Sequence, residues 1–414
     1  MRSSSSIGPT ARTCTKLSLV PQVVKPGYLI EHVANPTLHE VGFALYHAQF
    51  SNMRAKRLGR IRIDDGKLCN QGRGRRENAV GPYAFDDALT GSSITCDYPG
   101  LQALMVERLD EPNTCASLFF PGCSLINYGL PLVQSVYDLL KSAGEVDGIS
   151  LLCCGKILQY EPDGPAQRRS FEAELIEQVS ARGTRRIVAA CPNCVLALRG
   201  ALARDERTQG VEIVALPLLL AQMGYRVDTA VAREMLNREL VWRHPDWYDE
   251  AGSPTEACEA PEKLLFMPHD SCPDKKTGEF ADGLRALMPE ELLVEGEKVR
   301  KRSVCCGSLA RAAGKTELAD SQAREHGQDA SRLGASAIVT ACVSCTFQLM
   351  MAQREVPVFH YLELLFNWRI DWYHADAYMK LRFLFDDSLG VEKQGQGARN
   401  FVGLGGEGAA KEDA

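Results

Sequence analysis

Ten of the 15 cysteines form two sets of five with almost the same spacing, and this duplication constrains the fold more than any other feature of the sequence. The first set, called the first pentad, reads C-x29-CCG-x35-C-x-x-C and begins at Cys123. The second pentad reads C-x32-CCG-x34-C-x-x-C and begins at Cys272. Matching cysteines are separated by 149, 152 and 151 residues. A motif that recurs at nearly one offset predicts two copies of one domain.

The segments around the two pentads repeat as well. In each half a polar, helix-like stretch closes with a glycine, Gly183 or Gly334, the favoured residue just past a helix end. A short run of β-branched and small residues then leads into the C-x-x-C motif, and a second helix and an apolar strand follow. The expected helices cover 167–182, 195–203, 317–333 and 346–354, and the expected strands cover 187–190, 211–216, 337–341 and 356–361. Strands and helices that alternate at these lengths predict parallel sheets.

We therefore expect an α/β protein with two pseudo-repeated cysteine-rich domains, each with a parallel sheet, and an irregular N-terminal extension. In chain order, the expected parts are a net basic extension without an assigned role (1–110), the first cysteine-rich domain (111–245), a linker (246–260), the second cysteine-rich domain (261–390) and a disordered tail (391–414). The linker is rich in Asp, Glu, Ser and Pro, and the tail is rich in glycine and charge.

Charge is distributed unevenly along the chain. Residues 1–110 carry 14 Lys and Arg against 10 Asp and Glu, a net charge of +4, so the remaining residues carry −10 of the total of −6. Nine basic residues lie between Arg54 and Arg76. Such a run is typical of a solvated face or mobile loop, and a docking surface for an acidic partner is the second interpretation. Nucleic acid is not an expected partner, because no nucleic-acid-binding fold accompanies the run.

Several classes of protein are excluded by what the sequence lacks. No segment reaches the roughly 18 to 20 apolar residues of a membrane-spanning helix. No Walker motif appears, and we expect no flavin or nucleotide in this chain. The odd cysteine count and an N-terminus without an apolar signal-peptide core argue against a secreted disulfide scaffold. We expect a cytoplasmic protein whose thiols bind metal or perform redox chemistry.

Five thiols are more than one structural zinc ion needs, because zinc takes four ligands. The side chains of adjacent cysteines diverge, which suits two irons of one cluster better than a single tetrahedral ion. A helix that starts after each C-x-x-C would point its positive end at an anionic cluster, and Gly155 and Gly307 would let the backbone approach it. Iron–sulfur ligation is the preferred interpretation, and zinc in at least one motif remains the alternative.

The two complete motifs resemble the CCG domains of the heterodisulfide reductase B-like family over about residues 115–375. The same domain occurs in iron–sulfur subunits of glycolate oxidase, anaerobic glycerol-3-phosphate dehydrogenase and lactate-utilisation complexes. The resemblance implies two noncubane 4Fe–4S clusters that flank a small disulfide or thiol substrate. The implied ligands are Cys123, Cys153, Cys154, Cys191 and Cys194 for the first cluster, and Cys272, Cys305, Cys306, Cys342 and Cys345 for the second.

Many of these relatives carry a ferredoxin-like module that is missing here, which implies electrons from a separate ferredoxin-like iron–sulfur subunit or flavoprotein. The function implied by the resemblance is that of a disulfide reductase-type oxidoreductase subunit that reduces or forms a disulfide. The alternatives are a non-catalytic electron-transfer subunit of a lactate, glycolate or glycerol-3-phosphate dehydrogenase-type complex, and a zinc-stabilised interaction module.

Two further residues are candidates for a catalytic role. His269 lies shortly before Cys272, where it could donate a proton, although a structural hydrogen-bonding histidine is the commoner case. Lys156 directly follows the first CCG and could attract an anionic substrate, although a solvated lysine is the default.

Overall fold

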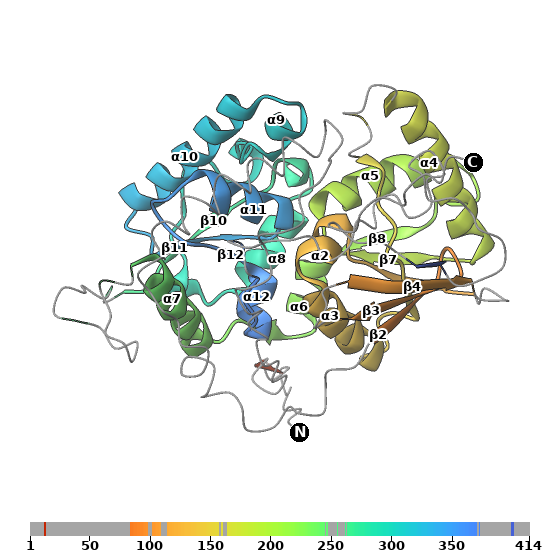
Figure 1. Cartoon of the computed structure of the whole chain (residues 1–414), viewed down its shortest axis with the longest axis horizontal. Helices are drawn as coiled ribbons and strands as arrows, with labels where there is room; N and C mark the ends of the chain where they lie inside the picture. Colours follow the sequence, from red (N-terminus) through yellow and green to blue (C-terminus); the bar gives the residue numbers. More distant parts are fainter. Residues whose placement is uncertain are drawn as a thin grey trace, which may run out of the picture. The chain divides into compact units, whose positions relative to one another are not determined.

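The computed structural model describes residues 12–13, 83–97, 102–108, 114–156, 159, 164–244, 246, 255, 261, 263–370, 372 and 399–400. These residues divide into two compact units (Figure 1). The first unit holds the described parts of Val20–Ile213, Leu309–Leu318 and Ile370–Ala414, and the second unit holds those of Met1–Leu19, Val214–Ser308 and Ala319–Arg369. Each pentad therefore lies within one unit.

The sequence placed residues 214–245 with the first domain, whereas the contacts group them with the second unit. The reason is the packing of helix α6 (Leu216–Gln222) on helix α8 (Glu279–Leu287). Gly283 of α8 lies so close to the backbone of Pro217 and Leu218 that a β-carbon would overlap it. The other domain boundaries expected from the sequence stay predictions.

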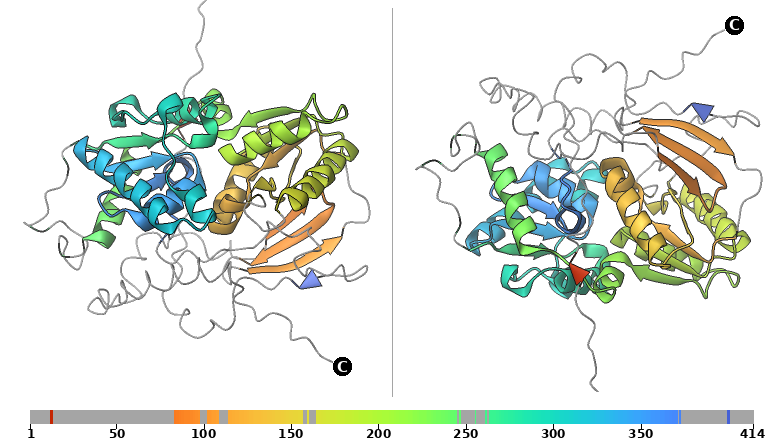
Figure 2. Two further views of the ribbon diagram at one scale, coloured as in Figure 1. Left: turned by 90° about the horizontal axis from the view of Figure 1, so that it is seen from above. Right: turned by 90° about the horizontal axis from the view of Figure 1, so that it is seen from below.

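The sheet of the first unit has the strand order β13-β4-β3-β2-β6-β5-β7-β8. Its strands are β2 (Tyr83–Asp87), β3 (Ser92–Asp97), β4 (Gln102–Arg108), β5 (Ser117–Phe120), β6 (Gly148–Ile149), β7 (Arg186–Ala189), β8 (Glu212–Ala215) and β13 (Arg399–Asn400). β5 is parallel to both β6 and β7, and β6 is parallel to β2. β2, β3 and β4 form an antiparallel meander, which Figure 2 shows in orange at one end of the unit.

Four helices accompany the parallel strands of the first unit. They are α2 (Cys123–Tyr128), α3 (Leu130–Ser142), α4 (Gly164–Ala181) and α5 (Pro192–Leu202). Figure 1 shows α3 on one face of the sheet and α4 and α5 on the other. With both faces covered, the strands are continuous apolar runs, and Leu118, Phe119 and Phe120 of β5 are completely buried.

The second unit is built on a three-stranded, all-parallel sheet with the order β10-β11-β12. The strands are β10 (Phe266–His269), β11 (Ala337–Thr340) and β12 (Val358–His360), and all of their residues are buried. Further elements are the short parallel pair β1 (Arg12–Thr13) and β9 (Tyr225–Arg226), the 3-10 turns η5 (Cys272–Asp274), η6 (Glu290–Leu292) and η7 (Arg300–Arg302), and helices α7 (Thr229–Arg243), α10 (Thr316–Arg332), α11 (Val343–Ala352) and α12 (Tyr361–Phe366). Helix α9 (Ser308–Ala312) falls, apart from its first residue, in the segment Leu309–Leu318 that the contacts group with the first unit.

The mixed α/β architecture, with parallel strands leading to each pentad, confirms the predicted fold class. The sheet of the first unit also contains antiparallel strands from residues 83–108, part of the segment that the sequence predicts to be an irregular extension. The four predicted helices correspond to α4, α5, α10 and α11, and the four predicted strands correspond to β7, β8, β11 and β12. The strands β2, β3 and β4 were not predicted, because the sequence of 1–110 has no clear period. Within the described part of the chain, no helix is both long and apolar enough to cross a membrane.

Candidate metal and iron–sulfur sites

The cysteines of the first pentad follow the ends of three parallel strands. Cys123 opens α2 shortly after β5, Cys153 and Cys154 follow β6, and Cys191 follows β7. The carboxyl ends of parallel neighbours lie at one edge of a sheet, which is where α/β proteins bind their ligands. In the second unit Cys272 likewise follows β10, and Cys342 follows β11. The fold therefore gathers each pentad at one sheet edge.

Within the first unit the five thiols form one chain of contacts. Cys153 is within hydrogen-bonding reach of Cys123 and of Cys154. Cys154 also reaches Cys194, and Cys194 reaches Cys191. All five are free thiols, and Cys153, Cys154 and Cys194 are buried whereas Cys123 and Cys191 are partly exposed.

The second pentad repeats this arrangement in the same order. Cys305 contacts Cys272 and Cys306, Cys306 contacts Cys345, and Cys345 contacts Cys342. These five cysteines are also free thiols, and Cys272 and Cys305 are the partly exposed members. The ten cysteines singled out in the sequence thus form two equivalent clusters, with the adjacent pair at the centre of each.

The C-x-x-C motif opens a helix in both units. Cys191 and Cys342 occupy the N-cap positions of α5 and α11, and neither side chain caps its helix. Cys194 and Cys345 lie in the first turn of these helices. The helices therefore begin inside the motif, whereas the sequence suggests that they begin after it. Pro192 at the start of α5 favours this placement, because proline fits the first helical position. The positive ends of both helices face the thiol clusters, which favours an anionic occupant.

Three glycines are required by the geometry of these sites. A β-carbon on Gly122 would lie 2.9 Å from the Cys194 sulfur. Gly155 has φ +69° and a β-carbon there would lie 2.6 Å from Phe171 of α4, and Gly307 has φ +103° and a β-carbon there would overlap the carbonyl of Ala319 in α10. Gly155 and Gly307 thus allow α4 and α10 to pack closely, a reason that differs from the expected approach to a cluster.

Contacts among the thiols shift their pKa values in both clusters. Contact with Cys123 and Cys154 raises the pKa of the Cys153 thiol far above its ordinary value. Contact with Cys305 raises the pKa of Cys306 to about 12. Cys154 is the exception: hydrogen bonds from Cys153 and Cys194 hold its pKa well below the ordinary value. Five neighbouring thiols cannot all ionise without compensating positive charge, which a bound metal would supply.

His269 lies in the second thiol cluster. A ligand atom of its ring and the sulfurs of Cys306 and Cys345 are all within 4.8 Å of one another, an arrangement that can hold a metal ion. His269 is only 2% exposed, and its Nε2 atom has no hydrogen-bond partner among the described residues. Burial lowers its pKa well below the ordinary value, so the ring is neutral, as a metal ligand must be. Its role as a proton donor stays a prediction.

Lys156 is partly exposed and lies beside the first thiol cluster. Its backbone N–H donates to Cys154, and its positive charge further lowers the pKa of that thiol. Its action on a substrate stays a prediction.

Two buried carboxylates, Asp87 and Asp270, hold the cysteine loops, a role that the sequence did not predict for either of them. Asp87 at the end of β2 accepts hydrogen bonds from the N–H of Leu151 (2.6 Å) and from the Ser150 hydroxyl, just before Cys153. In the second unit Asp270 accepts from the backbone N–H of Arg300 at 2.7 Å and from the Arg285 guanidinium at 2.9 and 3.0 Å. Because these partners are 15 to 64 residues apart in sequence, no local pattern could have revealed them.

The remaining cysteines do not join the clusters where the structure describes their side chains. Cys115 is buried and donates to the carbonyl of Ser117 at 3.3 Å. Cys14, Cys69 and Cys258 lie outside the described residues.

Comparisons with known proteins give one family match. The family model of CCG, a cysteine-rich domain, matches residues 117–199 and again residues 267–350. No curated protein matches the chain. Among solved structures, glutamate racemase from Bacillus anthracis is 12% identical with a TM-score of 0.27, covering 61% of this chain and 79% of its own. An aspartate racemase homologue from Pyrococcus horikoshii is 13% identical with a TM-score of 0.23, covering 61% of this chain and 96% of its own.

These two structural scores are too low to support any inference about this chain. Each of the two segments that the family model matches contains one complete pentad. The chain therefore carries two copies of the CCG cysteine-rich domain, each with five clustered thiols suited to binding metal or an iron–sulfur cluster.

Proposed function

We propose that the protein is an iron–sulfur oxidoreductase subunit that reduces, or in reverse forms, a small disulfide, with one noncubane 4Fe–4S cluster in each pentad. Electrons would come from a separate ferredoxin-like iron–sulfur subunit or flavoprotein. Reduction of one disulfide consumes two electrons and two protons and yields two thiols. A cytoplasmic location suits the proposal, because free thiol ligands persist in a reducing compartment.

The observation that carries this proposal is the order of thiol contacts, which is the same in both units. In each, the adjacent cysteines lie at the centre, with the lone cysteine at one end and the C-x-x-C pair at the other. A single tetrahedral zinc ion takes four ligands, so the fifth of these contacting thiols would remain unbound. Thiolates are the protein ligands of iron–sulfur clusters.

The residues present fit such a group in three further respects. The positive ends of α5 and α11 face the thiols, which stabilises a negatively charged cluster. Gly122 leaves space beside the Cys194 sulfur, which a β-carbon at 2.9 Å from that sulfur would fill. The Nε2 atom of His269 is buried without a partner among the described residues beside the second thiol cluster. When bound, an iron–sulfur cluster supplies one-electron redox chemistry and an iron that can bind sulfur.

The first experiment is to purify the protein without oxygen, measure iron, acid-labile sulfide and zinc, and record electron paramagnetic resonance and Mössbauer spectra. We expect about eight irons per chain and no zinc. Cys115→Ser is the matched control for Cys153→Ser, because both replace a buried cysteine and only Cys153 belongs to a cluster. Zinc without iron in the parent protein would overturn the proposal and favour a zinc-stabilised module.

The second experiment assays turnover, with reduced viologen as electron donor and a panel of small disulfides as acceptors. We expect disulfide-dependent oxidation of the viologen, lost in Cys153→Ser and in Cys306→Ser and retained in Cys115→Ser. Intact clusters that exchange electrons with viologen but never with a disulfide would contradict the reductase assignment. That outcome would leave an electron-transfer subunit of a dehydrogenase-type complex.

A further inference from the structure

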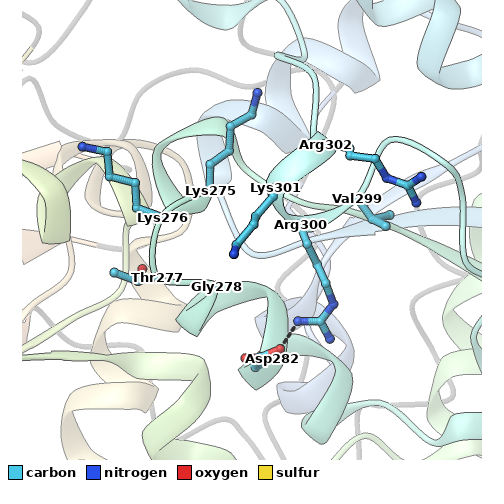
Figure 3. A pocket seen from close by; sticks show the side chains of 9 residues that line it. All are labelled: Lys275, Lys276, Thr277, Gly278, Asp282, Val299, Arg300, Lys301 and Arg302. Atoms are coloured by element: carbon cyan, nitrogen blue, oxygen red, sulfur yellow. Dashed lines mark hydrogen bonds and ion pairs between the residues drawn. The ribbon is translucent and has the colours of Figure 1, made fainter.

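Two short basic segments flank the second pentad in the sequence. Lys275 and Lys276 follow Cys272 after two residues, and Arg300, Lys301 and Arg302 end three residues before Cys305. In the structure the two segments come together and line one hollow of about 310 Å³ (Figure 3). We call the surface formed by these five basic residues the basic shelf.

Most of the charge on the basic shelf is not neutralised. Arg300 forms an ion pair with Asp282, drawn as a dashed line in Figure 3. The other four basic residues are exposed, and among the described residues none of them forms an ion pair. Elsewhere in the same unit, partly buried basic residues such as Arg285 and Arg369 are paired with carboxylates. The shelf therefore concentrates positive charge that the fold itself does not use.

Two carboxylates position the basic shelf: Asp270 precedes Cys272 in the sequence, and Asp274 follows it. Asp274 is buried and accepts from the N–H of Ala281 at 2.9 Å and from the Thr277 hydroxyl at 3.0 Å, which fixes the loop that carries the two lysines. Asp270 accepts from the N–H of Arg300 at 2.7 Å, which fixes the other segment. Both anchors lie two residues from Cys272, so the shelf and this cysteine share one framework.

Arg300 also has a strained backbone. Its φ of +54° lies in the left-handed region, which among the described non-glycine residues only Asn367 shares. Such strain persists only where the surrounding structure imposes it, and it occurs preferentially at functional sites. The strain at Arg300 is a second observation, independent of charge, that sets this surface apart.

The positions of the first unit that correspond to the shelf in sequence carry no basic residue, although its pentad has the same order of thiol contacts. The residues after Cys123 read Ser-Leu-Ile-Asn-Tyr, and those before Cys153 read Asp-Gly-Ile-Ser-Leu-Leu. Neither segment contains a basic residue. The shared fold and the shared thiol arrangement thus do not require positive charge at these positions, and only the second pentad has it.

We propose that the basic shelf is the docking surface for the acidic face of an electron-carrier protein that exchanges one electron with the second pentad's site. This inference rests on the proposed function. In the exchange the carrier is oxidised by one electron and the second site is reduced by one, with no bond made or broken in the chain. The adjoining Cys272 and Cys305 are the partly exposed thiols of their cluster, so a docked carrier faces the accessible edge of the site.

An acidic protein fits this surface better than a small anion does. Small-molecule sites enclose most of their ligand and are lined mainly by apolar groups with a few fixed polar ones. The shelf instead presents five long, exposed basic side chains around an open hollow, and four of them form no ion pair with a described residue (Figure 3). Spread positive charge of this kind raises the association rate of an oppositely charged protein.

The test uses the iron-loaded full chain and an acidic 2Fe–2S ferredoxin as the probe. Binding is measured by fluorescence anisotropy of labelled ferredoxin at low and at 0.5 M salt, and electron transfer from reduced ferredoxin is followed by stopped flow. The variant reverses four charges: Lys275→Glu, Lys276→Glu, Lys301→Glu and Arg302→Glu. We expect its affinity and its second-order electron-transfer rate at low salt to fall about 10- to 100-fold, and high salt to weaken parent binding similarly.

The control variant makes the same change in net charge at four exposed basic residues away from these segments, namely Arg169→Glu, Arg185→Glu, Lys263→Glu and Arg324→Glu. We expect it to retain affinity and rate within about threefold of the parent. An equal loss in both variants, no loss in the shelf variant, or no ferredoxin binding to the parent overturns the docking proposal. So does displacement of the ferredoxin by millimolar inorganic phosphate at constant ionic strength, because the shelf would then be a small-anion site.

Failure of the proposed function would look different from failure of the docking proposal. A parent protein without iron would contradict the proposed function, and anisotropy would still report whether the shelf binds ferredoxin. A parent with intact clusters whose shelf variant binds ferredoxin normally would contradict the docking proposal alone.

Discussion

A glycine follows the adjacent cysteine pair in both units, and Gly307 is the more restricted of the two. Its φ is +103°, and a β-carbon would overlap the carbonyl of Ala319 in α10. Gly334 has φ +67°, but nothing lies within 4 Å of the position that its β-carbon would take. A substitution at Gly334 introduces backbone strain without a steric clash, so it serves as the control for Gly307.

We expect Gly307→Ala to lower the free energy of unfolding by about 3 to 5 kcal/mol, since strain and steric overlap add. Gly334→Ala should cost about 1 kcal/mol, since only strain is introduced. Urea denaturation followed by circular dichroism measures both. Equal losses in the two variants would show that α10 can move away from residue 307 and that the close packing is dispensable.

At the scale of single residues, the sequence predicted the ten clustered cysteines through their duplicated spacing. It could not predict that Asp87 and Asp270 hold the loops on which those cysteines lie. Each accepts hydrogen bonds from residues far along the chain, and an aspartate at a strand end has no local pattern that distinguishes an anchor from a solvated side chain. It also could not separate the charge of the basic shelf from an ordinary solvated loop, because pairing depends on tertiary contacts.

At the scale of elements, β2 joins the sheet of the first unit through its pairing with β6 and through Asp87. Asp87 is 1% exposed, and burial raises its pKa. Besides Leu151 and Ser150, it accepts from the N–H of Leu89 at 3.0 Å and of Thr90 at 2.9 Å.

Asp87→Ala leaves these buried N–H groups without an acceptor, so we expect a loss of about 2 to 4 kcal/mol in the free energy of unfolding. Because Leu151 leads into Cys153, iron should be lost from the first site and retained in the second. Asp86→Ala, at the exposed neighbouring position, is the control and should keep both sites loaded. Iron analysis and Mössbauer spectra check this, and full iron content in Asp87→Ala would refute the anchoring role.

Helix α12 begins after His360, which is completely buried. Burial lowers the pKa of this histidine from its ordinary value of 6.5 to about 3. Between these two values the unfolded chain takes up a proton that the folded chain does not. The resulting stability is therefore fully present above pH 6.5 and is lost progressively as the pH falls toward 3.

We expect the parent to lose about 1.4 kcal/mol more than His360→Asn when the pH is lowered from 8.0 to 5.5, since one pKa unit corresponds to about 1.4 kcal/mol. Asparagine is chosen because it is a good N-cap and does not titrate. Urea denaturation of both proteins at the two pH values gives the difference, in which contributions from other groups cancel. Parallel pH curves would show that His360 does not couple protonation to folding.

The elements that the sequence predicted occur in both halves of the chain, whereas those that it missed occur once. The helices and strands around the pentads recur in both halves, so each copy supported the interpretation of the other. The meander of β2, β3 and β4 occurs once, and β3 to β4 has an irregular register near Cys96, which blurs the alternation that marks a strand. The segment 214–245 was assigned to the first domain by its position in the chain, and only the packing of α6 on α8 reveals its place in the second unit.

At the scale of the whole molecule, duplication gives two sites that do not share ligands. Every member of the first pentad belongs to the first unit, and every member of the second pentad belongs to the second unit. The thiol contacts described above each join two cysteines of the same unit. Loading of one site should therefore be independent of loading of the other.

This independence predicts additive iron losses. Cys153→Ser and Cys306→Ser remove the central pair's contacts in one unit each, so each variant should retain about half of the parent's iron, and the double variant almost none. Cys115→Ser should retain all of it, because this buried thiol only donates to the Ser117 carbonyl. Iron per chain, measured on protein prepared without oxygen, tests the additivity. If either single substitution emptied both sites, assembly of the two clusters would be coupled, and the two CCG copies would have to be treated as one cooperative site.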